Sequence, residues 1–128
     1  MKIVIIGGVA GGMSAAARLR RLDEKSDIVV IEKSGYVSFA NCGLPYYIGG
    51  VIEEKENLLL ETPYTLKEKF NLDVRVKSEA VSINREKKEI KIKNIETNDE
   101  YTESYDKLLI STGAKPFVPD IKGLEEAG

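Results

Sequence analysis

The feature that most constrains the fold is a glycine-rich turn near the amino terminus, Gly-Gly-Val-Ala-Gly-Gly at residues 7–12. A short β-branched apolar run at residues 3–6 precedes it, which is typical of a parallel strand buried on both faces. Residues 13–22 then contain three alanines and other helix-forming side chains, and residues 28–31 repeat the apolar run. Together these segments predict a βαβ unit, which belongs to a parallel sheet.

A glycine-rich turn between a strand and a helix lets backbone amides approach a pyrophosphate, which the helix N-terminus stabilises. The dinucleotide fingerprint has glycine at its first, third and sixth positions, which are Gly7, Val9 and Gly12 here, so the middle glycine is missing. Glu32 follows about 20 residues after the fingerprint, where a carboxylate binds ribose hydroxyls and disfavours a 2′-phosphate. The alternatives are a plain turn and a solvated surface carboxylate. NAD and FAD both use such a unit.

The rest of the chain predicts further elements of an α/β fold. We expect a helix within residues 43–52 that is broken by Gly49-Gly50, a short helix at 65–70 and a third strand at 72–76. From residue 80 onward the pattern changes to an antiparallel meander with one wet face and a turn at 96–100. A last buried strand at 107–111 returns the chain to the parallel sheet. The residues that alternate with polar ones in the meander are Val81, Ile83, Ile90 and Ile92.

The first helix has two faces in this prediction. Leu19 and Leu22 are expected to face the sheet, whereas Arg18, Arg20 and Arg21 point to water or to a ligand.

The chain has a single cysteine, Cys42, close to a predicted helix start. Proline is tolerated in the first turn of a helix, so Pro45 indicates a helix that begins at about Cys42. The positive end of that helix would favour the nucleophilic thiolate. The alternative is a buried cysteine that acts as an inert small hydrophobe.

Composition excludes several classes of function. The chain has no histidine, so it lacks the commonest general base and metal ligand, and we expect no metal site. A net charge of -2 with dispersed basic residues gives no nucleic-acid signature. One cysteine excludes an intrachain disulfide and fits a reducing cytoplasm. Glycines interrupt the apolar amino terminus, and we expect neither a signal peptide nor a membrane span.

Two further motifs carry a resemblance to a known family. The meander followed by Ser-Thr-Gly-Ala-x-Pro at residues 111–116 resembles the FAD-binding domain of the pyridine nucleotide-disulfide oxidoreductases. Ser-Phe-x-x-Cys at residues 38–42 resembles the single-cysteine branch, and residues 38–50 are especially similar to the CoA-disulfide reductase group. The resemblance covers residues 1–116. It implies a Rossmann-like FAD-binding domain with a parallel sheet and an antiparallel β-meander.

The resemblance also implies roles for individual residues. Cys42 would be the redox-active thiol beside the flavin. Expected contacts to the FAD are Gly7, Val9, Ala10, Gly11, Gly12, Glu32, Lys33, Asn41, Val81, Thr112, Gly113 and Ala114. Expected contacts to coenzyme A or the thiol pocket are Ser14, Arg18, Arg21, Ser38 and Asn41. Two guanidiniums one turn apart on a helix suit phosphate groups, although they could instead only solubilise the helix.

The implied reaction is reduction of a CoA disulfide, persulfide or polysulfide by NAD(P)H through FAD and a mixed disulfide between Cys42 and coenzyme A. Residues 1–116 would be the amino-terminal part of the FAD-binding domain, and 117–128 would lead to an absent NAD(P)H domain. The whole enzyme would be a cytoplasmic homodimer, and the 128 residues alone would be inactive.

Two other functions remain open at this point. One is an NADH oxidase in which Cys42 cycles through a sulfenic acid. Oxidase and peroxidase members carry a histidine at the position of Ala10, which counts against this function, although some oxidase-type members also lack it. The other is a non-catalytic dinucleotide-binding module with a structural cysteine.

Overall fold

The computed structural model describes residues 1–123 and has an α/β fold with two separate sheets. A four-stranded parallel sheet has the order β3-β2-β1-β7, and a three-stranded antiparallel sheet has the order β4-β5-β6. This confirms the predicted fold class. The elements, with η for short 3₁₀ helices, are β1 (Lys2–Ile6), α1 (Ala10–Leu22), β2 (Asp27–Ile31), η1 (Asn41–Gly43), α2 (Leu44–Ile48), η2 (Lys55–Leu58), α3 (Pro63–Phe70), β3 (Asp73–Arg75), β4 (Ser78–Asn84), β5 (Glu89–Asn94), β6 (Glu100–Ser104) and β7 (Lys107–Ile110).

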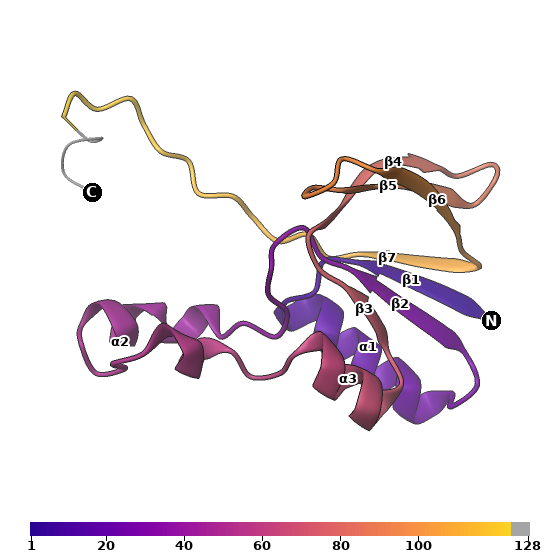
Figure 1. Cartoon of the computed structure of the whole chain (residues 1–128), viewed down its shortest axis with the longest axis horizontal. Coiled ribbons are helices and arrows are strands. Elements are labelled where there is room, and N and C mark those ends of the chain that lie inside the picture. The colour runs from indigo at the N-terminus through magenta and orange to yellow at the C-terminus, as the bar shows by residue number, and fades with distance from the viewer. Residues whose placement is uncertain (124–128) are drawn as a thin grey trace.

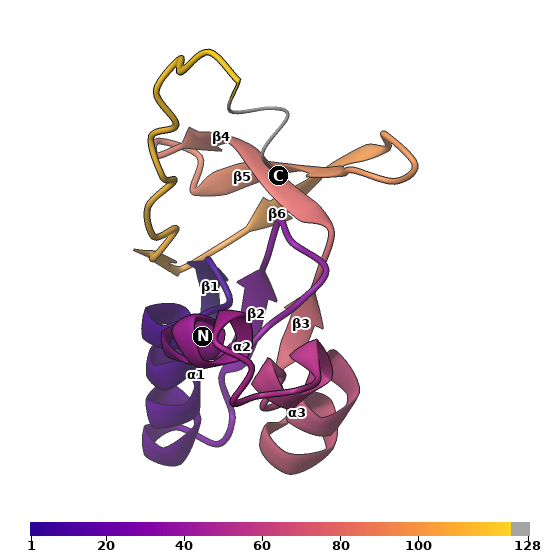
Figure 2. The same cartoon turned by 90° about the vertical axis from the view of Figure 1, so that its left-hand side faces the viewer.

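The parallel sheet separates two apolar layers because its central strands are buried on both faces. Figures 1 and 2 show α1 and α3 on one side of this sheet and the antiparallel sheet on the other. Ile3 and Ile5 of β1 pack on the helix side, whereas Val4 and Ile6 pack toward the antiparallel sheet. Each fully buried aliphatic side chain contributes about 1.5–3 kcal/mol to folding. The uninterrupted apolar run of β1 therefore follows from burial on both sides.

The first helix begins at Ala10, earlier than predicted, and two of its side chains contradict the expected faces. Arg20 is only 9% exposed, and Leu22 is 66% exposed. Arg20 is buried because its guanidinium donates hydrogen bonds to four backbone carbonyls at the ends of α1 and α3, at 2.8–3.2 Å. Leu22, at the last turn of α1, lies outside the apolar layer. The accepting carbonyls belong to Asp23, Glu24, Phe70 and Asn71.

The predicted helix at residues 43–52 is shorter in the structure. Its first turn is the 3₁₀ helix η1, which contains Cys42, and α2 then runs only from Leu44 to Ile48 with Pro45 in its first turn. Figure 1 shows α2 at one end of the molecule, away from both sheets. The next helix, α3, begins two residues before its predicted start because Thr62 caps it and Pro63 occupies its first position.

The antiparallel sheet is attached to the parallel sheet by packing and by charge. Ile90 and Ile92 of β5 are fully buried against the parallel sheet. Glu103 of β6 forms ion pairs with Lys2 of β1 and Arg75 of β3. The register of β4 shifts between residues 80 and 82, and Val81 is 49% exposed at that irregularity rather than buried.

Residues 111–121 contain no helix or strand. The predicted connecting segment covers residues 117–128. Its residues 124–128 lie outside the described residues.

Candidate functional site

The glycine turn at the carboxyl end of β1 is tightly packed. Gly7 has a φ of +106°, and a Cβ atom there would lie 2.0 Å from the carbonyl oxygen of Ser111. A Cβ at Gly12 would lie 1.8 Å from the carbonyl oxygen of Gly7. The first and last fingerprint positions thus need glycine so that α1 can approach the turn and β7. Val9, at the middle position, is half-buried and lines a cavity.

Glu32 lies directly beside this turn. It is 8% exposed, and its Oε2 accepts a hydrogen bond of 2.6 Å from the backbone N–H of Gly8. Its Oε1 accepts a hydrogen bond of 2.8 Å from the N–H of Ser34. Each carboxylate oxygen can accept a further hydrogen bond, so the group can still bind hydroxyls while the backbone holds it in place.

A cavity of about 210 Å³, the Glu32 cavity, lies at the carboxyl ends of β1 and β2 against β4. This is the edge of a parallel sheet at which ligands bind. Lys33 lines it and forms an ion pair of 2.7 Å with Glu79. The sequence missed Ser78 and Glu79, which reach the cavity only through the turn from β3 to β4. The complete lining is Ile6, Gly7, Ile31, Glu32, Lys33, Ser78, Glu79, Ala80 and Thr112.

An open apolar groove of about 330 Å³ adjoins this cavity and contains Val81. It shares Ile6, Ala80 and Thr112 with the Glu32 cavity and adds Ile110 from the end of β7. Val81 and Thr112, two predicted cofactor contacts from distant segments, therefore line one groove.

A second cavity, of about 380 Å³, combines the start of α1 with the loop at residues 38–42; we call it the Cys42 cavity. Cys42 is exposed, so the alternative of a buried cysteine is wrong. Met13 and Leu60 are lining residues that the sequence did not single out, because their apolar character suggested only the core. The complete lining is Val9, Ala10, Met13, Ser14, Ser38, Phe39, Ala40, Asn41, Cys42 and Leu60.

The loop at residues 38–42, which we call the cysteine loop, is held from both sides by backbone hydrogen bonds. The N–H of Ser38 donates to the carbonyl of Gly8 at 3.0 Å, which joins the loop to the glycine turn. On the other side, the N–H of Ala40 donates to the carbonyl of Leu58 at 2.8 Å, and the N–H of Leu60 donates to the carbonyl of Ser38 at 3.2 Å. Ser38 has a φ of +52°, a left-handed conformation that is uncommon outside glycine and is often found at functional sites.

Three predicted substrate residues share one face of α1. Ser14, Arg18 and Arg21 are spaced four and then three positions apart and are all exposed. Ser14 lines the Cys42 cavity, and the two arginines continue the same face toward the end of the helix. Neither guanidinium forms an ion pair with another described residue. Their charges therefore remain available to an anion.

The remaining predicted residues lie around the end of β7. Gly113 and Ala114 are exposed, and Gly113 has a φ of +70°. Ser111 was not predicted as a site residue, yet its Oγ would lie 2.6 Å from a Cβ placed on Gly11. This hydroxyl therefore faces the glycine turn. No local signal indicates this, because the contact joins residues at opposite ends of the chain.

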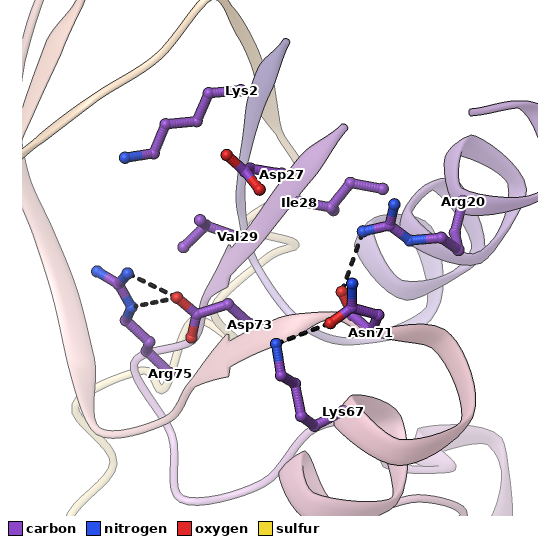
Figure 3. A pocket seen from close by; sticks show the side chains of 9 residues that line it. All are labelled: Lys2, Arg20, Asp27, Ile28, Val29, Lys67, Asn71, Asp73 and Arg75. Atoms are coloured by element: carbon purple, nitrogen blue, oxygen red, sulfur yellow. Dashed lines mark hydrogen bonds and ion pairs between the residues drawn. The ribbon is translucent and has the colours of Figure 1, made fainter. Parts of the chain in front are cut away.

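A third cavity, of about 310 Å³, lies at the amino ends of the parallel strands, opposite the glycine turn. Figure 3 shows three of its basic side chains paired within the protein: Arg75 with Asp73, and Lys67 and Arg20 with Asn71. The fourth, Lys2, pairs with Glu103. These pairs stabilise the fold and leave few donors for a ligand.

Residues 1–123 meet neither the requirements of a metal site nor those of a membrane-spanning helix. No group of three or more histidine, cysteine, aspartate or glutamate residues that could hold a metal ion occurs there. No helix in that part of the chain is both long enough and apolar enough for a bilayer.

The sequence matches the model of the pyridine nucleotide-disulphide oxidoreductase family over residues 1–128. The chain therefore belongs to this family, which confirms the resemblance. Family membership agrees with the glycine turn, the carboxylate beside it and the exposed cysteine next to the same turn.

Among known members the chain is similar to a coenzyme A disulfide reductase of Staphylococcus epidermidis, with 46% identity over 113 residues, which are 88% of this chain and 26% of the relative. The solved structure of reduced Bacillus anthracis CoADR-RHD is 60% identical, with a TM-score of 0.92 over 98% of this chain and 22% of that chain. An NAD-dependent persulfide reductase from A. fulgidus is 42% identical, with a TM-score of 0.91 over 98% of this chain and 23% of that one. A water-forming NADH oxidase from Lactobacillus brevis is 27% identical, with a TM-score of 0.87 over 98% and 28%.

Proposed function

We propose that this chain is the amino-terminal part of a flavin-dependent NAD(P)H reductase whose substrate is CoA disulfide or a related CoA persulfide. The observation that carries the proposal is the Cys42 cavity, because the exposed Cys42 and residues at the start of α1 line the same cavity. Homologues named coenzyme A disulfide reductase and persulfide reductase support this substrate class.

The whole activity requires more protein than this chain contains. The chain spans 26% of the curated relative's length. In our proposal residues 1–116 form part of the FAD-binding domain and residues 117–128 connect it to an NAD(P)H-binding domain. The complete protein acts as a homodimer in the cytoplasm, and the 128 residues alone turn nothing over.

The residues at the glycine turn fit an FAD. The absence of side chains at Gly7 and Gly12 keeps the turn tight against α1, whose N-terminus favours a pyrophosphate. Glu32 is held beside the turn with acceptor capacity for ribose hydroxyls. The chemistry that bound FAD supplies is two-electron transfer from NAD(P)H to a disulfide. The other residues that would contact it are Val9, Ala10, Gly11, Lys33, Asn41, Val81, Thr112, Gly113 and Ala114.

Cys42 is the nucleophile in this proposal. Its thiolate attacks one sulfur of the substrate disulfide, a Cys42–CoA mixed disulfide forms, and the other CoA leaves as a thiolate. One protein cysteine is enough because the substrate provides the second sulfur. Ser38 and Asn41 line the same cavity as the reacting sulfur.

Coenzyme A is held along the exposed face of α1. Its phosphates carry negative charge, and Arg18 and Arg21 are cations without an ion-pair partner among the described residues. Ser14 lies on the same face and also lines the Cys42 cavity. The helix face thus leads from the phosphate-binding arginines to the thiol.

A second candidate function is NADH oxidation by oxygen, which the similarity to a water-forming NADH oxidase favours. The lower identity to that enzyme, 27% against 60% for the Bacillus anthracis structure, supports the disulfide substrate instead. Parallel measurement of oxygen consumption and CoA-disulfide consumption by the complete enzyme separates the two functions. A complete protein that binds NAD without flavin absorbance would instead be a non-catalytic module.

The direct test is mass spectrometry of the complete protein purified without reductant. We expect the peptide that contains Cys42 to carry a CoA adduct that dithiothreitol removes. A Cys42→Ser variant should bind FAD but carry no adduct at this peptide. A wild-type protein that never carries a thiol adduct at Cys42, even after incubation with CoA disulfide, would contradict the proposed reaction.

A further inference from the structure

The cysteine loop has little regular structure of its own. Cys42 lies in the three-residue helix η1, and α2, which follows, has only five residues. Isolated helices of this length are unstable without tertiary contacts, because helix nucleation is unfavourable. The position of the thiol must therefore depend on contacts with other parts of the chain.

Leu58 supplies such contacts on both sides of Cys42. Upstream, its carbonyl accepts the hydrogen bond from the N–H of Ala40, and the neighbouring residues Phe39 and Leu59 form an antiparallel bridge. Downstream, Gly43 is buried, and its missing Cβ would lie 2.5 Å from Cδ2 of Leu58. The Leu58 side chain thus occupies the space that any larger residue at position 43 would need.

The two contacts are linked through η1 itself. The N–H of Gly43 donates to the carbonyl of Ala40 at 2.9 Å, so the residues that flank Cys42 are bonded to each other as well as held by Leu58. Leu58 is 1% exposed and fixed at the end of η2. A buried, close-packed side chain transmits a change of one methyl group to its neighbours.

We propose that Leu58 is a positioning residue for Cys42: its backbone and side chain fix η1 so that the thiol faces the cavity at the start of α1. The proposal rests on the proposed function only in taking Cys42 as the reacting thiol. Leu58 touches neither substrate nor cofactor in this proposal and acts through Ala40 and Gly43.

The test is a compensating pair of substitutions in the complete protein. Gly43→Ala adds a methyl group against Leu58, and Leu58→Val removes one carbon from the same contact. The measurement is the rate constant for alkylation of the Cys42 peptide by iodoacetamide, followed by mass spectrometry. We expect Gly43→Ala to change this rate about tenfold and the double variant to return it to within about twofold of wild type.

A matched control uses another glycine with room for a side chain. A Cβ at Gly35 would lie 3.5 Å from Cε of Lys77, an ordinary contact, so Gly35→Ala should leave the alkylation rate unchanged. Thermal unfolding of every variant shows that the protein remains folded at the temperature of the assay. A purely structural role for Leu58 would alter the melting temperature without altering alkylation of the folded protein.

Several outcomes would overturn the proposal. One is a folded Gly43→Ala variant with the wild-type alkylation rate, and another is a changed rate that Leu58→Val does not restore. If Gly43→Ala does not fold, Leu58→Val alone decides, and a rate change of less than about twofold overturns the proposal. Restored alkylation together with no CoA adduct on the wild-type protein would refute the proposed function but not the positioning role.

Discussion

The backbone N–H of Ser38 donates a hydrogen bond of 3.0 Å to the carbonyl oxygen of Gly8. The N–H of Gly8 in turn donates to the carboxylate of Glu32 at 2.6 Å. One glycine in the dinucleotide turn therefore connects the carboxylate on one side with the cysteine loop on the other. We expect a substitution of Glu32 to affect the position of the cysteine loop through Gly8, and a change in that loop to affect Glu32 in the same way.

Glu32→Ala should lower the free energy of unfolding by about 2–4 kcal/mol, because the buried N–H of Gly8 and the partly buried N–H of Ser34 lose their acceptor. The same substitution should weaken FAD binding. Urea unfolding and flavin fluorescence titration measure the two effects. Glu79→Ala is the control, since this residue lines the same cavity but forms an exposed ion pair worth less than about 1 kcal/mol. Equal destabilisation by both variants would contradict the role of Glu32.

Gly12→Ala should prevent stable folding or displace α1, because the new Cβ would lie 1.8 Å from a backbone oxygen. Gly11→Ala should be milder, since its Cβ would meet only the hydroxyl of Ser111, at 2.6 Å. A double variant, with Ser111→Ala added to Gly11→Ala, should reverse most of the decrease in melting temperature that Gly11→Ala causes. Circular dichroism melting curves test this order, and a Gly12→Ala protein as stable as wild type would refute it.

Arg20→Met should destabilise the protein by about 3 kcal/mol, because it removes four partly buried hydrogen bonds to backbone carbonyls. Figure 3 shows this guanidinium directed at Asn71, beyond the end of α3. Arg21→Met makes the same change on the neighbouring, exposed arginine and should alter stability by less than about 0.5 kcal/mol. Urea unfolding of the two variants measures the difference. Similar losses in both would mean that the hydrogen bonds of Arg20 do not stabilise the fold.

Glu103 should make the attachment of the two sheets dependent on pH. Burial acts to raise the pKa of Glu103, but hydrogen bonds and ion pairs with Lys2 and Arg75 outweigh it and lower the pKa below its usual value of 4.5. The stabilisation is thus fully present above about pH 5 and is lost as the pH falls from 4.5 through the lower folded-state pKa.

At pH 7 we expect Glu103→Gln to lower the free energy of unfolding by about 1–3 kcal/mol. This difference in the free energy of unfolding between the variant and the wild type should become smaller toward pH 3. Urea unfolding across this pH range measures it. Glu100→Gln is a control on the same strand, because its ion pair with Lys91 is exposed at both ends. A constant difference between pH 7 and pH 3 would exclude the ion pairs as its cause.

Replacing both Arg18 and Arg21 with glutamine should raise KM for CoA disulfide about tenfold and leave kcat within about twofold in the complete enzyme. Uniform loss of substrate binding away from the reacting sulfur has this kinetic signature. Arg85→Gln, an exposed arginine in the turn after β4, controls for the general loss of positive charge. An unchanged KM would mean that the two arginines only solubilise α1.

The fold was largely predictable because its signals are local. The continuous apolar runs at β1 and β2, and the turn between β1 and α1, specify a βαβ unit without knowledge of distant contacts. Pro45 likewise indicated a helix start close to where one occurs. The length of α2 was overestimated, because nothing local distinguishes a five-residue helix from a longer one before a glycine pair.

The contacts that hold the site were less predictable because they join distant residues. Arg20 was expected to point to water or to a ligand, because an arginine is rarely buried. The carbonyls that accept its hydrogen bonds include those of Phe70 and Asn71, some 50 positions away. Leu58 and Ser111 gave no chemical signal at all. Their importance comes from the space that they fill beside Gly43 and Gly11.

The order β3-β2-β1-β7 places the first strand of the chain beside its last, with Ile3 opposite Lys107. The central sheet has high contact order, because the antiparallel sheet intervenes in the chain between these partners. During synthesis on the ribosome, one edge of β1 therefore stays unpaired until β7 has emerged. During that interval the nascent chain carries an unpaired strand edge, which favours aggregation and chaperone binding.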